Sequence, residues 1–219
     1  KDKIIIDSSS GNAGIAYSMI GNSLGYKVEI VIPGNASLER KQRMIAHGTK
    51  IIETDPIEGY DEALRHVQGE WLLILDADAQ LQEDVLQRLV SFACKGHWSA
   101  VQLRKSVINV QQNYLTRFQA MEMAMDAVIQ QGRFAVGGIV ELRGNGQFLK
   151  RSILDECGGF NEDTVTDDLD LSFRLLTTDS LVGILWNPPV QEEAVETISA
   201  LWKQRQRWAE GGLQRFFDY

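Results

Sequence analysis

The sequence contains only two cysteines, Cys94 and Cys157, and neither belongs to a CxxC pair. Zinc sites and redox-active dithiols usually need such pairs, so the sequence gives no reason to expect either. No apolar run approaches the roughly 18 residues that a membrane-spanning helix needs. No signal peptide opens the chain, and we therefore expect a soluble, cytoplasmic protein.

Basic residues are also scarce, because 22 Lys and Arg stand against 30 Asp and Glu and give a formal net charge of −8. A general nucleic-acid binder would usually be basic, so this balance argues against that class. It still permits a phosphate-bearing ligand, since a divalent cation can join acidic side chains to phosphate oxygens. The 219 residues suit one α/β domain, or at most two small ones.

Strands and helices alternate in the first third of the chain. The predicted strands cover residues 3–7, 27–33, 50–54 and 70–78, and the predicted helices between them cover 12–24, 37–47 and 59–68. This alternation indicates a mostly parallel sheet with helices on both faces, which is a three-layer α/β/α sandwich.

After Asp78 the elements are less regular. Helices are predicted over 83–94, 111–131 and 167–176, with strands over 99–104 and 182–189. The segment 137–151 is predicted as a strand, a glycine loop and then another strand or the entry of a helix. We expect the prolines to end the last strand, and Gly211–Gly212 to interrupt a helix over 198–219. Met121 and Met125 stand at i, i+4, which favours packing in the core.

A buried strand ends in an acidic pair in the stretch LLILDADAQL, where Asp76 and Asp78 stand two residues apart. Ligands of open α/β sheets bind at the carboxyl ends of strands. Two carboxylates there can hold Mg²⁺ or Mn²⁺ and leave positions open for phosphate oxygens. The alternative is a turn in which Asp78 begins the next helix.

Two downstream stretches carry further candidates. Asp167, Asp168 and Asp170 crowd the first turn of a predicted helix, where they either complement its dipole or include a general base with a raised pKa. In QRQRW, Arg207 could neutralise a leaving phosphate and Trp208 could stack on a sugar ring. The alternative there is an amphipathic helix at an interface.

The order of these motifs resembles the inverting family-2 glycosyltransferases, the relatives of cellulose, chitin and hyaluronan synthases. Asp-x-Asp, Gly-Asn-Gly-Gln, Thr-Asp-Asp and Gln-x-x-Arg-Trp follow one another within residues 69–219. The resemblance implies a GT-A-like nucleotide-sugar transferase architecture, sugar transfer from a nucleoside diphosphate donor to a glycan or lipid hydroxyl, and Mg²⁺ or Mn²⁺ as cofactor.

The same resemblance implies a role for each matching residue. Asp78 would bind the metal with Asp76 beside it, and Asp168 would be the general base. The donor and acceptor would be bound by Gln204, Arg207, Trp208, Asn145, Gln147 and Asp167. We expect Asp76, Asp78 and Asp168 to gather at one rim of a continuous sheet.

Residues 1–68 resemble a different family, the fold-type II pyridoxal-phosphate enzymes, and cysteine synthase most closely. The stretch SSSGNAGIAYSMIGNSLG carries the resemblance, and its anion-binding turn would comprise Ser10, Gly11, Asn12, Ala13 and Gly14. Amides at a helix start attract anions. The pyridoxal lysine would precede this turn, however, and only six residues precede Asp7, so we expect no catalytic pyridoxal site.

We therefore interpret the chain as a single composite domain over 1–219, recombined near Gly69 and engineered rather than natural. The nucleoside-binding opening of the transferase is replaced, so we expect activity to be weak or absent. Two alternatives stay open, a folded scaffold without catalysis and pyridoxal-phosphate binding without a Schiff base. The resemblance implies that the parent synthases lie on the cytoplasmic face of a membrane and continue into membrane helices. If those helices were removed, apolar surface would remain exposed around Trp202, Phe216 and Phe217 and would favour self-association.

Overall fold

The chain divides into two compact units, Lys1–Gln68 and Gly69–Tyr219. The computed structural model describes residues 4–8, 12–34, 36–54, 69–76, 78–161, 164–178 and 180–218, so the helix expected over 59–68 lies outside the described residues. The boundary between the units falls where the two family resemblances meet. The single composite domain over 1–219 remains a prediction.

The first unit contains a parallel sheet in the order β1-β2-β3, formed by Ile4–Ser8, Lys27–Pro33 and Lys50–Thr54. Two helices accompany it, α1 (Asn12–Ser23) and α2 (Leu38–Ala46). Branched side chains of β2 and one methionine of α2 form its core, namely Val28, Ile30, Ile32 and Met44. Burying these side chains stabilises the β-α-β alternation that the sequence predicts.

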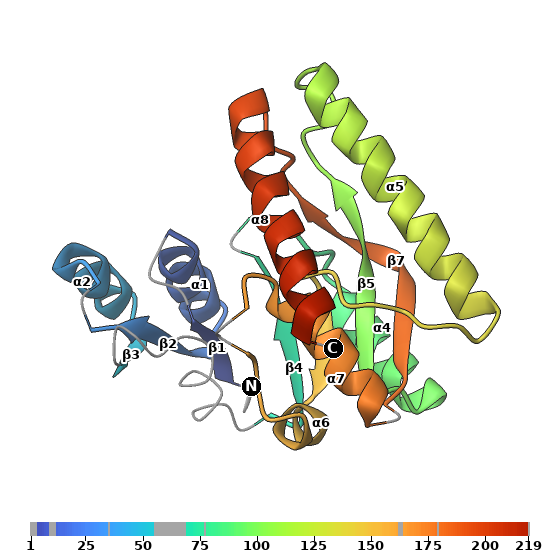
Figure 1. Ribbon diagram of the computed structural model, residues 1–219. Helices are drawn as coiled ribbons and strands as arrows, with labels where there is room; N and C mark the ends of the chain where they lie inside the picture. Colours follow the sequence, from blue (N-terminus) through green and yellow to red (C-terminus); the bar gives the residue numbers. More distant parts are fainter. Residues whose placement is uncertain are drawn as a thin grey trace. The chain divides into compact units, whose positions relative to one another are not determined.

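The second unit contains a four-stranded sheet in the order β4-β6-β5-β7. Its elements are β4 (Trp71–Ile74), α4 (Val85–Gly96), β5 (Ala100–Val107), α5 (Tyr114–Ala135), β6 (Gln147–Lys150), α6 (Arg151–Glu156), α7 (Asp167–Thr177), β7 (Val182–Glu192) and α8 (Ile198–Asp218). Figure 1 shows α5 lying along β5 and β7. One face of α4 packs against the sheet through Val85, Leu89 and Ala93.

The sheet of the second unit is mixed. β5 and β7 are parallel, whereas β6 is antiparallel to both β4 and β5. β6 runs backward because its preceding loop is bonded at the carboxyl end of β4, where the Gly146 N–H donates to the Ile74 carbonyl at 3.0 Å. Among the described residues the strands form two sheets, in place of the continuous sheet that the sequence predicts.

β7 does not end at its prolines, and the predicted end of that strand is wrong. The strand continues to Glu192, and its pairing with β5 is shifted between Leu103 and Lys105. Prolines lack the N–H that a ladder needs, so the irregular stretch accommodates them and pairing resumes at Val190. The shift keeps Glu192 in the sheet, next to the end of β4.

Two other local predictions are also wrong. The segment 137–146 forms no strand, because its groups bond to side chains, as in the Leu142 N–H donating to Ser172 Oγ at 2.8 Å. Met121 and Met125 are 61% and 64% exposed, since α5 turns smaller and polar residues toward the sheet. Trp202, Phe216 and Phe217 are exposed as expected.

α8 is one continuous helix through Gly211 and Gly212, contrary to the predicted interruption. Gly211 is buried against Thr166, at the start of α7, and a Cβ on Gly211 would overlap Thr166 Oγ1. The glycine therefore permits close approach of α7 and α8, and tertiary packing outweighs its low helix propensity.

We predict that Gly211→Ala lowers the free energy of unfolding by about 1–3 kcal/mol, because the new methyl group overpacks the contact with Thr166. The matched control is Gly212→Ala, where a Cβ meets nothing within 4 Å. That change should leave stability unchanged or raise it by up to about 1 kcal/mol through helix propensity. Urea unfolding of both variants measures the difference, and equal stabilities would contradict the packing argument.

Candidate active site

The acidic pair Asp76 and Asp78 follows β4 in an exposed turn. The Ala79 N–H donates to the Asp76 carbonyl at 3.0 Å and closes this turn. Both aspartate side chains are exposed to solvent. Their carboxylates are therefore available to a ligand at the carboxyl edge of the sheet, which is where the sequence predicts them.

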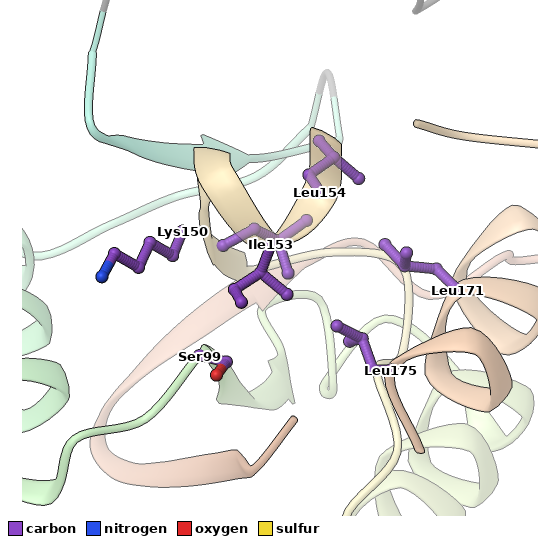
Figure 2. A pocket seen from close by; sticks show the side chains of 7 residues that line it. Ser99, Lys150, Ile153, Leu154, Leu171 and Leu175 are labelled. Atoms are coloured by element: carbon purple, nitrogen blue, oxygen red, sulfur yellow. The ribbon is translucent and has the colours of Figure 1, made fainter. Parts of the chain in front are cut away.

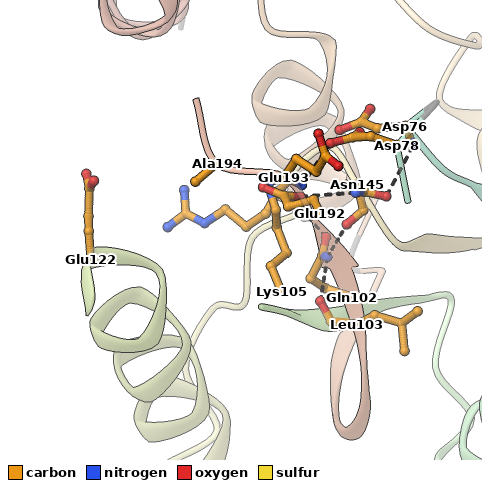
Figure 3. Close-up of polar contacts among 12 residues, drawn as sticks. Asp76, Asp78, Gln102, Leu103, Lys105, Glu122, Asn145, Glu192, Glu193 and Ala194 are labelled. Atoms are coloured by element: carbon orange, nitrogen blue, oxygen red, sulfur yellow. Dashed lines mark hydrogen bonds and ion pairs between the residues drawn. The ribbon is translucent and has the colours of Figure 1, made fainter. Parts of the chain in front are cut away.

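The end of β7 holds this turn in place. Gln80 and Gln191 exchange two main-chain hydrogen bonds of 2.8 and 3.0 Å. The Glu193 N–H donates to the Asp78 carboxylate at 2.9 Å. Figure 3 shows Asp76 and Asp78 beside Glu192 and Glu193. The acidic turn is thus fixed by a segment more than a hundred residues further along the chain.

The loop 143–146 bonds to the same turn from another side. Asn145 is fully buried, its Oδ1 accepts from the Asp76 N–H at 3.1 Å, and its Nδ2 donates to Glu192 Oε2 at 3.0 Å. Gly144 and Gly146 have φ of 73° and 78°, a left-handed conformation that glycine adopts without strain. The Asn145 side chain is therefore bonded inside the protein, and its predicted part in acceptor binding stays a prediction.

Two glutamines among the predicted site residues retain unused polar atoms. Gln147 is 3% exposed and donates to the Gly144 carbonyl at 2.7 Å, but its Oε1 has no hydrogen-bond partner. The Oε1 of Gln204 in α8 is also buried and unpartnered. A buried acceptor without a donor is costly, so both atoms would gain from a donor group on a ligand.

A charged pair that sequence reasoning did not identify lies beneath the acidic turn. Lys105 in β5 and Glu192 in β7 are 3.0 Å apart, with side chains 17% and 14% exposed. The Lys105 amine also donates to the Arg143 carbonyl at 3.3 Å. Neither residue stands out in the sequence, because β5 contains other polar residues and Glu192 ends β7 next to Glu193.

Charged side chains on three other elements shift the pKa of Asp76. Partial burial by surrounding atoms raises the pKa of Asp76, and the charges of Glu192 and Asp78 raise it further. Lys105 and Arg207 oppose this and lower the pKa. Arg207 of α8 is therefore within electrostatic range of Asp76, and its predicted part in binding the diphosphate stays a prediction.

Asp168 stands at the start of α7 close to the same loop. Burial raises its pKa, and the neighbouring charge of Asp167 raises it further, whereas the Leu169 N–H and Lys105 lower it. Its Oδ2 would lie 3.6 Å from a Cβ on Gly144. Lys105 thus lowers the pKa of both Asp76 and Asp168.

The other two acids of this helix start differ from each other. Burial also raises the pKa of Asp167, opposed by main-chain hydrogen bonds. Asp170 is buried and paired with Arg174 at 2.7 Å, and Arg174 donates to the carbonyls of Cys157 and Gly159. Asp170 therefore anchors the preceding loop and does not belong to the candidate site.

In α8, Trp208 is 38% exposed and the Arg205 guanidinium lies 4.2 Å from its ring centroid. Arg205 also pairs with Glu122 of α5. The ring has one face occupied by a cation, and its predicted stacking on a sugar stays a prediction.

The predicted anion turn lies in the other unit and is only partly described. Ser10 and Gly11 lie outside the described residues, and Asn12, Ala13 and Gly14 begin α1. Gly14 is buried and its carbonyl accepts from Ser18 Oγ at 2.7 Å. Anion binding there stays a prediction.

The site could hold a divalent cation through two ligands. Within the described part of the chain, no three His, Cys, Asp or Glu side chains form a group that could hold a metal ion. Mg²⁺ and Mn²⁺, however, are often held by one or two carboxylates together with substrate phosphates. Asp76 and Asp78 fit this requirement, because both are exposed hard oxygen donors.

A pocket elsewhere in this unit offers little chemistry. Its lining is mostly leucine and isoleucine, and Lys150 contributes the only ionisable side chain: Ser99, Leu149, Lys150, Ile153, Leu154, Leu171 and Leu175 (Figure 2). Lys150 pairs with Trp71 at the amino end of β4, opposite to the acidic turn. The pocket is thus separate from the candidate site.

Comparison with known proteins divides the chain in the same place. The family described as glycosyl transferase family group 2 matches residues 71–219, and the pyridoxal-phosphate dependent enzymes match residues 1–80. The two resemblances are confirmed and are consistent with a chimera. None of the helices in the described part is long and apolar enough to cross a membrane.

Individual relatives agree with the family matches. A β-monoglucosyldiacylglycerol synthase of Synechocystis is 52% identical over 159 residues, which are 73% of this chain and 33% of that protein. A cysteine synthase of Aquifex aeolicus is 48% identical over 66 residues, 30% of this chain and 20% of that enzyme. The chain thus spans about a third of the synthase and a fifth of the cysteine synthase.

A solved structure has the same fold. The mannosyltransferase PcManGT from Pyrobaculum calidifontis, in complex with GDP-Man and Mn²⁺, has a TM-score of 0.67 and 17% identity, over 99% of this chain and 64% of that one. The predicted α/β fold of the nucleotide-sugar transferase type is therefore confirmed.

We predict that Asp168→Asn stabilises the folded protein at neutral pH by about 1 kcal/mol, the usual size of a single-site effect. Its pKa is raised above 3.8 in the folded state, so the folded protein binds the proton more tightly than the unfolded chain. The free energy of unfolding of the parent then falls as the pH rises from the ordinary aspartate pKa through the raised pKa of Asp168.

Urea unfolding at pH 4 and pH 7 measures the effect. The extra stability of Asp168→Asn over the parent should be present above the raised pKa of Asp168, and it should shrink as the pH falls below that pKa. The exposed Glu83 provides a control, since Glu83→Gln removes a charge where no burial acts on it. A constant difference between Asp168→Asn and the parent at all pH values would contradict the burial argument.

Proposed function

The chain belongs to glycosyl transferase family group 2 through residues 71–219, and on this premise we propose that this segment transfers a sugar from a nucleoside diphosphate donor to an acceptor hydroxyl. The proposal is supported most directly by Asp76 and Asp78, which share one turn, and by Asp168, because Lys105 acts electrostatically on both Asp76 and Asp168. The first two follow β4 and the third begins α7, so the arrangement combines a cation-binding pair with a separate base.

In the proposed reaction, Asp76 and Asp78 would hold Mg²⁺ or Mn²⁺, which would supply positive charge to neutralise the departing diphosphate. The Asp168 carboxylate accepts the proton of the acceptor hydroxyl as its oxygen bonds to the anomeric carbon. The bond from that carbon to the phosphate oxygen breaks, and its electron pair leaves with the diphosphate. A single in-line displacement inverts the anomeric centre.

The residues of α8 complete the proposed site. Arg207, already within electrostatic range of Asp76, would bind the diphosphate as a cation. Gln204 has an unpartnered buried Oε1 that a donor or acceptor hydroxyl would satisfy. Trp208, Asn145, Gln147 and Asp167 keep the roles that the motif order implies for them.

The proposed substrate is taken from one of the similar proteins. The synthase of Synechocystis is named for a monoglucosyldiacylglycerol product and shares 52% identity with this chain over 159 residues. We extend this to glucose as the transferred sugar and the hydroxyl of diacylglycerol as the acceptor. The nucleotide is proposed to be uridine diphosphate.

A scaffold without catalysis is the second candidate. It is favoured by the pyridoxal-phosphate enzyme match over residues 1–80, where the transferase family would place its nucleoside-binding acids. The chain would then be an engineered recombinant with weak or absent transfer. Both candidates predict the same fold, so only ligand binding and turnover separate them.

We predict that millimolar Mn²⁺ with UDP-glucose raises the thermal midpoint of the parent chain, because a ligand that binds only the folded state stabilises it by about 2.7 kcal/mol at a hundredfold excess over Kd. Asp78→Ala should abolish this shift, since it removes an exposed metal-binding carboxylate. Glu83→Ala should keep the shift. No shift of the parent would favour the scaffold.

We also predict that Asp168→Asn retains the shift with Mn²⁺ and UDP-glucose but lowers glucosyl transfer roughly 10²- to 10⁴-fold, the usual contribution of a general base. Radiolabelled glucose incorporated into diacylglycerol measures the transfer. A variant as active as the parent would contradict the assignment of Asp168. A parent with ligand binding but no transfer would indicate that the recombined chain has lost catalysis.

A further inference from the structure

Glu192 uses both carboxylate oxygens, and each contacts a different part of the site. Its Oε1 lies 3.0 Å from the Lys105 amine, and its Oε2 accepts from Asn145 Nδ2 at 3.0 Å. Asn145 in turn accepts the Asp76 N–H at 3.1 Å. A continuous chain of contacts therefore leads from Lys105 through Glu192 and Asn145 to the backbone of the acidic turn (Figure 3).

The residues on both sides of Glu192 hold the same turn. Gln191 exchanges two main-chain hydrogen bonds with Gln80, and the Glu193 N–H donates to Asp78 Oδ2 at 2.9 Å. The end of β7 thus contacts the turn directly on the Asp78 side and through Asn145 on the Asp76 side. The Glu192 carboxylate supplies the second of these connections.

We propose that Glu192 is a positioning residue, which fixes the Asp76–Asp78 turn for cation binding by holding the Asn145 amide. The proposal rests on the function proposed above for that turn. Glu192 itself is directed to Lys105 and Asn145, so it acts through Asn145 and is not a ligand of the cation. Neither family resemblance assigned a role to Glu192 or Lys105.

The loss of the contact between Glu192 and Asn145 is costly because Asn145 is buried. Asn145 has no exposed surface, so removing the Glu192 carboxylate leaves its Nδ2 without that acceptor. A buried donor without a partner is costly, and the amide would rotate or shift to recover a hydrogen bond. Either movement disturbs the Asn145 Oδ1 contact with the Asp76 N–H.

The first test needs no ligand. Amide hydrogen exchange by NMR on the full chain should show Asp76 exchanging about tenfold or more faster in Glu192→Ala, because its N–H loses a fixed acceptor. The Leu103 amide, which donates to the Gly146 carbonyl at 2.9 Å, provides an internal reference for global stability. Unchanged exchange at Asp76 would overturn the proposal.

The matched control changes the same charge one position further on. The Glu193 side chain is exposed, and only its backbone N–H contacts the acidic turn. Glu193→Ala therefore removes a carboxylate near the site but leaves the connection to Asn145 intact. It should exchange like the parent at Asp76, and acceleration equal to that of Glu192→Ala would overturn the positioning role.

The second test measures Mn²⁺ affinity by electron paramagnetic resonance in the presence of UDP. Outer-sphere partners of metal ligands typically contribute roughly 10- to 100-fold in affinity, so Glu192→Ala should bind Mn²⁺ at least about tenfold more weakly than Glu193→Ala. Glu192→Gln, which keeps one acceptor oxygen for Asn145, should recover part of this loss. An equal loss in Glu192→Gln and Glu192→Ala would overturn the hydrogen-bond mechanism.

A double-variant cycle separates an indirect role from direct ligation. If Glu192 acts through Asn145, Glu192→Ala combined with Asn145→Ala should bind Mn²⁺ no more weakly than the weaker single variant. Additive losses would overturn the proposal, because Glu192 would then contact the cation itself. If the parent binds no Mn²⁺, the proposed function fails, and the exchange of the Asp76 amide still decides the positioning role.

Discussion

The hydrogen bonds of the buried Asn145 amide connect the parts of the candidate site. Its two polar ends face the Asp76 backbone and the Glu192 carboxylate, and its own carbonyl accepts from Gln102 Nε2 at 2.8 Å. The buried side chain of Asn145 thus joins the turn after β4 to the end of β7, and its backbone carbonyl is bonded to β5. This amide and the main-chain bonds from the end of β7 together fix the acidic turn.

The predictable part of the fold consists of segments whose own residues determine their structure. Alternating apolar runs and glycine stops place the elements of the first unit within a few residues, and the acidic pair lies at the end of β4 as expected. Lys105 and Glu192 could not be paired from sequence, since they contact each other only after β5 and β7 align in parallel. The order of motifs along the chain carries no information about such cross-strand contacts.

The errors share a physical cause, because local preference was outweighed by contacts between distant residues. The prolines of β7 and the glycines of α8 should each end an element by propensity. The sheet passes the prolines by shifting its register, and α8 passes Gly211 because that position packs on Thr166. Both exceptions serve the site, since one brings Glu192 to the acidic turn and the other brings α8 to the start of α7, where Asp168 stands.

The charge balance of the site explains why these contacts are needed. Burial raises the pKa of Asp76 and of Asp168, acidic neighbours raise each pKa further, and Lys105 is already paired with Glu192. One ammonium group therefore cannot neutralise the cluster, and a rigid backbone must hold like charges together. Under the proposed function, a bound cation would offset this repulsion, so the site would gain binding at some cost in stability. The end of β7 and Asn145 supply that rigidity. The groups with which they bond to the turn are N–H and amide groups, which add no net charge to it.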